Sequence, residues 1–376
     1  MSGKKAIRYY RPTSAEIDLN AIRHNLEIVS HIVKDDIKIL GVVKADAYGH
    51  GMEEVSKAIV DYVDYFGVAS LDEAAALRRI GIKKPILAVG AILPEEVEGV
   101  LKFNVIQAVS DLDIPRRLSR LGQARNKKIK VHVKVDTGMG RLGFWHEEAV
   151  DFIKKIAGLK NIIIDGIFTH FPNAEADRVF TYSQIRNFKR LVEKLWDNNI
   201  YIPLKHTANS MALIDFKDSH MNMVRPGLMM YGIYPKETLM KNILLRPALT
   251  LKTKITYLKS IPKGRSISYG MTYVTPRPTK IATIPVGYGD GYSRHFSNKA
   301  HVLIRGSRCP IVGRVCMDMC MVDVGHLKNV KVGDDVILIG AQGNEIIRAE
   351  ELAGLINTIP YEVLCNIGRR VPRIYK

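Results

Sequence analysis

The chain has 376 residues, of which 47% are hydrophobic and 25% are charged, and its formal net charge at pH 7 is +18. This length suits two domains, and the composition is that of a globular protein rather than a disordered or fibrous one. The basic residues are spread along the sequence without a basic–aromatic cluster, which argues against a nucleic-acid-binding protein.

Targeting and cysteine patterns point to a reducing compartment. Residues 1–19 lack the apolar core of a secretory signal, and no run approaches the ~18 apolar residues of a membrane span. The four cysteines (Cys309, Cys316, Cys320 and Cys365) form neither a disulfide framework nor a paired C-x2-C zinc pattern. We therefore expect a cytoplasmic protein that binds no metal and has no membrane or nucleic-acid partner.

Short apolar runs alternate with helical patterns between residues 37 and 232. The runs predict strands at 37–44, 65–70, 85–90, 105–110, 128–136, 161–170, 201–209 and 222–232, with helical spacing at 71–80, 146–158 and 182–199. Eight such units predict an α/β fold, a (β/α)8 barrel of the TIM type. A doubly wound open sheet is the alternative, but no G-x-G-x-x-G follows the first run.

The pattern changes after residue 243. Apolar residues now alternate with period two between proline and glycine turns, which predicts an all-β, β-rich domain. One helix at 349–359 and a short strand at 371–375 are expected to finish it. We place the barrel at residues 12–242 and the β domain at 243–376, and residues 1–11 could pack with the latter.

Polar side chains collect where the predicted barrel strands end, which is where barrels carry function. Asn209 and Ser210 precede an apolar helical stretch and are typical of a helix N-cap. Gly227 in the eighth run would let backbone N–H groups approach a phosphate closely. Lys44 ends the first run and would face this phosphate site, which suggests pyridoxal phosphate held as a Schiff base.

Several long motifs, in the same order along the chain, resemble those of the alanine racemases. They are VVKADAYGHG (42–51), KVDTGMGRLGF (134–144), HTANSMA (206–212), VRPGLMMYG (224–232), SYGMTY (268–273), VGYGDGYSR (286–294), GRVCMDM (313–319) and PYEVLCNIGRRVPRIY (360–375). The resemblance runs from residue 11 almost to the last residue. It implies a homodimeric pyridoxal 5'-phosphate enzyme with shared active sites that interconverts L- and D-alanine, supplying D-alanine for peptidoglycan.

The resemblance also implies a role for particular residues. Lys44 and Tyr269 correspond to the two catalytic bases, with Tyr269 donated by the partner subunit. Cofactor-binding residues would be Lys44, Tyr48, His170, Asn209, Ser210, Arg225, Gly227, Leu228 and Tyr361, of which Arg225 would contact the pyridine nitrogen with His170 behind it. Arg141, Met317 and Asp318 match the substrate site, Tyr288 and Tyr361 match the entrance, and Lys134 matches a lysine that is often carbamylated.

Some positions depart from the family pattern, and some alternatives stay open. The family more often has Asn at Asp46, Ala at Gly289 and Gln at Met319, and the entrance acid could be Glu175 or Asp177. A racemase of another small amino acid such as serine remains an alternative. A barrel-type decarboxylase normally pairs the pyridine nitrogen with an acid, so Arg225 argues against it. A non-catalytic carrier would lack the β domain.

Overall fold

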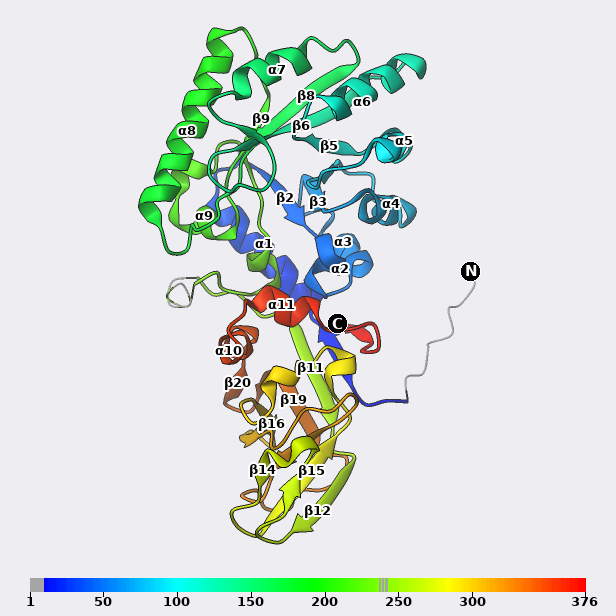
Figure 1. Ribbon diagram of the computed structural model, residues 1–376, viewed down its shortest axis with the longest axis vertical. Helices are drawn as coiled ribbons and strands as arrows, with labels where there is room; N and C mark the ends of the chain where they lie inside the picture. The colour runs from blue at the N-terminus through cyan, green and yellow to red at the C-terminus, as the bar shows by residue number, and fades with distance from the viewer. Residues whose placement is uncertain (1–9, 237, 239, 241–242) are drawn as a thin grey trace. The chain divides into compact units, whose positions relative to one another are not determined.

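The computed structural model describes residues 10–236, 238, 240 and 243–376, which fall into two compact units (Figure 1). The barrel unit comprises residues 21–47 and 52–246. The β unit comprises residues 10–20 and 48–51 together with 247–376. Each unit is described by itself below.

Parallel strands form the centre of the barrel unit. In spatial order they are β10 (Met223–Val224), β2 (Lys38–Val42), β3 (Tyr65–Val68), β4 (Ile86–Ala88), β5 (Ile106–Val109), β6 (Ile129–Asp136), β8 (Ile162–Phe168) and β9 (Leu204–His206), with β7 (Phe144–Trp145) beside β6. The N–H of Arg225 donates to Ala208 O at 3.1 Å and thereby joins the two end strands. The barrel is therefore nearly closed, and the predicted eight-stranded architecture is confirmed.

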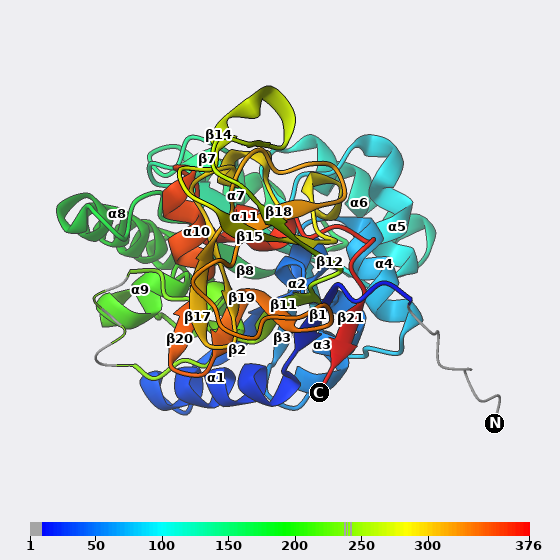
Figure 2. The same cartoon turned by 90° about the horizontal axis from the view of Figure 1, so that it is seen from below.

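Helices surround these strands in two perpendicular views (Figures 1 and 2). They are α1 (Leu19–Ile32), α3 (Met52–Ile59), α4 (Leu71–Arg79), α5 (Val97–Lys102), α6 (Asp113–Ala124), α7 (Ala149–Ala157), α8 (Arg178–Asp197) and α9 (Ser210–Asp215). The predicted helices at 71–80, 146–158 and 182–199 are confirmed. Helix α8 begins earlier than expected because Asp177 caps it, accepting the N–H of Phe180 at 2.9 Å.

The interior of the barrel explains why the strand sequences are apolar without alternation. Strands covered on one face by helices and on the other by the barrel core have no solvent-facing side. One interior cluster consists of Leu40, Tyr65, Leu87, Ile106, Leu204 and Met223, contributed by strands from around the barrel. Burial of each such side chain stabilises the fold by roughly 1.5–3 kcal/mol.

The β unit contains three sheets among its described residues. The largest has the order β17 (Ser307–Pro310), β16 (His301–Ile304), β19 (Asp335–Gln342), β11 (Leu249–Lys254), β1 (Ser14–Ile17) and β21 (Arg373–Tyr375), with β20 (Glu345–Ile347) beside β19. The others pair β12 (Tyr257–Ile261), β15 (Thr279–Ile284) and β18 (Cys320–Asp323), and β13 (Ser266–Ile267) with β14 (Tyr273–Val274). The prediction of a β-rich carboxyl-terminal region is confirmed.

Two local predictions need correction. The β unit ends with two helices, α10 (Ala349–Leu355) and α11 (Pro360–Cys365), where one was expected. Helix α11 is too short to show a period, although Pro360 at its start is a typical first helical residue. The eighth strand ends at Val224, so Arg225 follows it, since Pro226 has no N–H to continue the ladder.

Among the described residues, no helix has the length and apolar character that a membrane crossing requires.

Candidate active site

Lys44 begins a left-handed turn at the carboxyl end of β2. The turn, α2 (Lys44–Tyr48), holds Ala45 at φ 52°, ψ 51° and Ala47 at φ 54°, ψ 49°, with Asp46 between them in the same region. Left-handed helical geometry costs L-residues roughly 1–2 kcal/mol each, because Cβ approaches the following carbonyl oxygen. A run of such residues persists only where its surroundings hold it, so this backbone is a built feature of the site.

Two carboxylates hold the turn in place. Glu73, on α4, accepts the N–H of Ala45 at 2.7 Å through one oxygen and that of Ala69 at 2.6 Å through the other. Asp46 accepts the N–H of Met52, the first residue of α3, at 2.7 Å. Asn would keep this acceptor oxygen, so the Asp46 departure preserves the contact. The role of Glu73 was not predicted, because the sequence of residues 71–80 contains no feature that distinguishes Glu73 from a solvent-exposed glutamate of a helix.

Arg225 is a buried cation of the site and is 7% exposed. Its Nη2 donates to the carbonyl oxygens of Thr169 (2.8 Å) and Thr207 (3.0 Å) and lies 3.3 Å from His170 Nδ1. Its Nη1 lies 3.0 Å from His206 Nδ1. Burial lowers its pKa to about 9, so the guanidinium is still charged at neutral pH. Its Nε has no hydrogen-bond partner within the part of the chain that the structure describes.

Cations gather around His170. Burial lowers the pKa of His170 well below its ordinary value, and the charges of Arg225, Lys134, Arg141 and Lys44 lower it further. The predicted residues Lys44, Lys134, Arg141, His170 and Arg225 are therefore neighbours at the carboxyl ends of the barrel strands. Such an arrangement favours an anionic ligand and an uncharged imidazole.

Lys134 lies on β6 with its amine against an aromatic face. The Nζ atom is 4.5 Å from the centre of the Phe168 ring, and the residue is 4% exposed. Burial lowers its pKa well below the usual value, and the charges of Arg225 and Arg141 act in the same direction. Burial and neighbouring cations therefore disfavour the ammonium form of this lysine and favour its nucleophilic, uncharged form.

Asp136 organises the loop that carries Arg141. Its Oδ1 accepts the N–H groups of Gly138 (2.8 Å) and Met139 (2.7 Å). Its Oδ2 accepts those of Gly140 (2.8 Å) and Arg141 (3.2 Å). One carboxylate therefore holds four consecutive N–H groups at the end of β6. This positioning role of Asp136 was not predicted from the motif at 134–144.

Asn209 and Ser210 occupy the start of α9, as the N-cap pattern predicts. The Asn209 side chain accepts the N–H of Ala212 at 3.0 Å. Ser210 Oγ accepts the N–H groups of Gly227 at 2.9 Å and Met229 at 3.4 Å. Ser210 therefore joins α9 to the segment after β10 that contains Gly227 and Leu228, and its own hydroxyl hydrogen points elsewhere.

The β unit brings together a second group of the predicted residues. Tyr48 and Tyr361 meet edge to face with their ring centroids 5.4 Å apart. The N–H of Tyr288 donates to Cys316 O at 3.0 Å, next to Met317, and Asp318 accepts from Arg370 at 2.7 Å. A Cβ at Gly289 would lie 2.5 Å from Arg370 Nη1, so a side chain here would require the arginine to shift.

Tyr269 is presented to solvent by a strained turn. It lies in η5 (Tyr269–Met271) and is 71% exposed. Its neighbour Ser268 has φ 65° and Met271 has φ 47°, both in the left-handed region that non-glycine residues avoid. The Ser268 hydroxyl donates to Arg314 O at 2.6 Å and anchors the turn.

Together these features define a class of protein: a barrel with a lysine on an unusual turn and a group of cations at the carboxyl ends of its strands, combined with a β unit. Family models agree with this class. Residues 17–235 match the model described as "Alanine racemase, N-terminal domain" and residues 248–375 match "Alanine racemase, C-terminal domain".

Individual relatives are similar over nearly the whole chain. The alanine racemase of Halothermothrix orenii is 48% identical over 371 residues, covering 98% of both chains. The solved alanine racemase of Clostridium difficile 630 has a TM-score of 0.92 at 42% identity and covers 98% of this chain and 97% of that one. The Bacillus anthracis alanine racemase with bound L-Ala-P has a TM-score of 0.91 at 36% identity, covering 98% and 96%. The chain therefore belongs to the alanine racemase family and is an enzyme of the isomerase class.

Proposed function

We propose that the protein interconverts L-alanine and D-alanine with bound pyridoxal 5'-phosphate, using Lys44 and Tyr269 of the partner subunit as bases on opposite faces of the substrate. The product D-alanine would serve peptidoglycan synthesis in the cytoplasm. Family membership supports the reaction, and the site geometry supports the roles of individual residues.

Arg225 carries the proposal. Its terminal nitrogens contact backbone carbonyls and histidines, which hold the guanidinium in place and keep Nε available to donate to a ligand. A donor with no proton-accepting capacity suits an unprotonated pyridine nitrogen. When bound, pyridoxal phosphate supplies an electron-withdrawing ring that acidifies the α C–H of an amino acid. Arg225 keeps this withdrawal moderate, which favours racemisation over transamination, whereas the acidic partner of a decarboxylase would strengthen it.

We assign the remaining candidate residues of the two units to the ends of the cofactor and the substrate. Lys44 would hold the cofactor aldehyde and accept or return the α proton on one face. The Ser210 hydroxyl and the backbone N–H groups near Gly227 and Leu228 would bind the phosphate, joined by the hydroxyls of Tyr48 and Tyr361. Arg141, fixed by Asp136, would bind the substrate carboxylate together with the backbone of Met317.

The lowered pKa of the buried Lys134 amine supports carbamylation. Its Nζ would form a bond to the carbon of CO2 and release one proton, leaving a carbamate anion. That anion would compensate the charges of Arg225 and Arg141, both of which act on the Lys134 amine. Asp177 is engaged in capping α8, so we favour Glu175 as the entrance acid.

Exposed apolar groups of the β unit support a homodimer with shared sites. A cavity of about 520 Å³ is lined by Tyr257, Ile267, Tyr269, Met319 and Met321 among others. Tyr269 and Met319 are largely exposed, as expected of groups that complete the site of a second copy.

The direct test is chemical. Purified protein should convert L-alanine to D-alanine and the reverse, and should absorb visible light as a pyridoxal enzyme does. Borohydride reduction followed by peptide mapping should place the cofactor on Lys44. A label on another lysine would contradict the assignment, and equal kcat/KM for L-serine and L-alanine would contradict the preference for alanine.

A further inference from the structure

A chain of buried polar groups leads from Arg225 through the inside of the barrel. Arg225 Nη1 lies 3.0 Å from His206 Nδ1, and His206 Nε2 lies 2.9 Å from His132 Nδ1. His132 Nε2 lies 3.7 Å from Asp165 Oδ2, and Asp165 Oδ1 pairs with Lys130 Nζ at 2.9 Å. Both imidazoles are fully buried.

The chemistry of arginine fixes the direction of the two hydrogen bonds that link Arg225, His206 and His132. A guanidinium only donates, so His206 Nδ1 must be the acceptor and carries no proton. A neutral His206 then bears its hydrogen on Nε2 and donates to His132 Nδ1. His132 in turn bears its hydrogen on Nε2, which faces the Asp165 carboxylate. His132 Nε2 and Asp165 Oδ2 lie 3.7 Å apart, and neither atom has a closer polar partner among the described residues.

The backbone is shaped to admit His132. Gly166 on β8 faces this ring, and a Cβ there would lie 2.5 Å from His132 Cε1. The pairing of β6 with β8 shifts register at this point, between Val131 and His132, so Asp165 is the extra residue of a bulge. The Phe168 ring stacks on His206 at 4.7 Å with an interplanar angle of 3° and fixes its plane.

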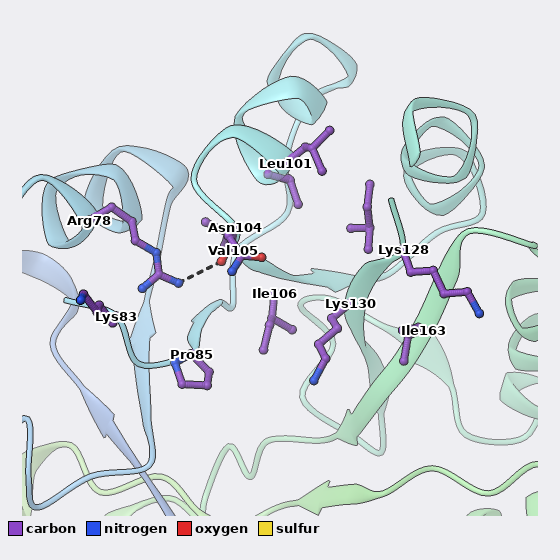
Figure 3. Close-up of a pocket in the computed structure, with 12 residues that line it drawn as sticks. Arg78, Lys83, Pro85, Leu101, Asn104, Val105, Ile106, Lys128, Lys130 and Ile163 are labelled. Carbon is purple, nitrogen blue, oxygen red and sulfur yellow. Dashed lines mark hydrogen bonds between the residues drawn. The ribbon is translucent and has the colours of Figure 1, made fainter. Parts of the chain in front are cut away.

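Lys130, the last of these polar groups, reaches solvent at the end of the barrel opposite to Arg225. Lys130 lines a cavity of about 270 Å³ at the amino-terminal ends of β5, β6 and β8, together with Ile106 and Ile163 (Figure 3). The Asp165 charge is therefore paired at this surface, whereas the two imidazoles between it and Arg225 have no contact with water.

We propose that His132 and Asp165 are positioning residues for Arg225: they hold His206 as the Nε2–H tautomer, which keeps Nδ1 free to accept from the guanidinium. This inference rests on the proposed role of Arg225 at the pyridine nitrogen. Without the acceptor at His132, the opposite tautomer of His206 would direct an N–H at Arg225, and the guanidinium would lose its fixed orientation. Burial lowers the pKa of both histidines, which agrees with neutral rings.

The first test reads the tautomers directly. Long-range 1H–15N spectra of [15N]histidine-labelled enzyme distinguish the two ring nitrogens, with assignments from His132→Gln and His206→Gln. We expect both rings to be neutral Nε2–H tautomers at pH 7. An Nδ1–H tautomer or a cationic ring at either position would overturn the proposal. The spectra do not depend on turnover. If the parent enzyme proved inactive, the proposed function would fail, but the spectra would still test the proposed tautomers of His132 and His206.

The second test separates positioning from folding. His132→Leu should lower kcat about tenfold with KM changed less than about twofold, because a lost buried hydrogen bond is worth roughly that much. His132→Gln supplies both an acceptor for His206 and a donor for Asp165, and should recover kcat to within about threefold. The matched control is Gln107→Met. Gln107 is a buried residue of the adjacent strand β5 whose side chain donates to Gly90 O, and we expect its replacement to leave kcat unchanged. Equal losses in the Leu, Gln and control variants would overturn the proposal.

A variant at the outer end covers the case in which His132→Leu does not fold. Asp165→Ala removes the acceptor of His132, whereas Asp165→Asn keeps an acceptor oxygen in place. Since Asp165 pairs with Lys130, which lines the cavity, we expect both to fold, with kcat lowered only by the alanine variant. The same kcat in both variants would contradict the role of Asp165.

Discussion

Several candidate site residues of the barrel unit are buried, whereas several of those in the β unit are exposed. Arg225, Lys134 and Ser210 in the barrel unit are buried, whereas Tyr269, Met317 and Tyr288 in the β unit are 71%, 53% and 43% exposed. In the barrel unit each polar group is fixed by contacts within that unit, such as the four N–H groups on Asp136. In the β unit, contacts instead fix the backbone of the turn at Tyr269, while the side chains of Tyr269, Met317 and Tyr288 are exposed.

This difference indicates a division of labour. Burying cations without full compensation is unfavourable, so the barrel unit is incomplete without anionic ligands. Exposed tyrosine and methionine side chains on a strained turn are also unfavourable unless something covers them. This contrast supports the proposal that the barrel unit receives small anionic ligands and that the β unit receives the surface of a second copy.

The largest expected effect tests whether the two units serve one site from different chains. Lys44→Ala and Tyr269→Phe should each lower kcat by about a thousandfold or more, since each removes a base. Co-expressed in equal amounts, the two variants should recover roughly a quarter of the parental activity. Random pairing makes about half of the dimers mixed, and one of the two sites in each mixed dimer is intact.

The control for this experiment is the fraction of mixed dimers, measured by native mass spectrometry with differently tagged chains. If mixed dimers are abundant and activity stays at the level of the single variants, then Tyr269 acts on its own chain or not at all. The contrast between the two units would then have another cause.

A smaller effect is expected from the carboxylate that fixes the Arg141 loop. Asp136→Asn replaces an acceptor of two N–H groups with an amide that points its own hydrogens at them. Loss of charge-assisted hydrogen bonds of roughly 1.5–3 kcal/mol should lower kcat/KM for alanine by about 10- to 100-fold, mainly through KM. Steady-state kinetics in both reaction directions would measure this.

The matched control lies in the β unit. Asp323 accepts from the Thr279 hydroxyl at 2.6 Å and from the Gly325 N–H at 2.9 Å, so it also organises a loop. Asp323→Asn should reduce stability without changing KM. Similar KM values for the Asp136 variant and the parent would show that Arg141 does not depend on its loop.

Much of the barrel could be predicted from sequence because its determinants are local. Strands covered on both faces read as continuous apolar runs, and Asn209 before an apolar helix is a local capping signal that the structure confirms. The position of Lys44 at a strand end followed from the same reasoning. The roles assigned to the site residues from the family resemblance stay predictions.

What the sequence did not reveal depends on contacts between distant residues or on rare backbone states. No residue in 45–47 is glycine, so the left-handed turn has no sequence signal and depends on Glu73 from the next helix. His132 stands in an apolar run like any core histidine, and its partner His206 is 74 residues away. Such pairs become visible only when the barrel brings β6 and β9 to the same interior.

The smallest effect concerns stability against pH, and it should again divide the two units. Among the described residues, the histidines with a lowered pKa are His132, His170, His206 and His220, and all lie in the barrel unit. Burial is the main cause in each case. A histidine kept neutral in the folded state takes up a proton on unfolding below about pH 6.5, so its stabilising contribution is present above that pH and is lost as the pH falls.

The unfolding free energy should therefore decrease between pH 7.5 and 5.5, by up to about 1.4 kcal/mol for each such histidine at the lower pH. Carboxylates with lowered pKa values, such as Glu16 and Asp165, act only at more acidic pH. Hydrogen exchange, corrected for its intrinsic pH dependence, should show protection lost in β6, β8 and β9 but kept in the sheets of the β unit. His220→Gln retains a donor for Leu213 O and should make the pH dependence shallower. Equal loss of protection in both units would mean that the buried histidines do not govern acid stability.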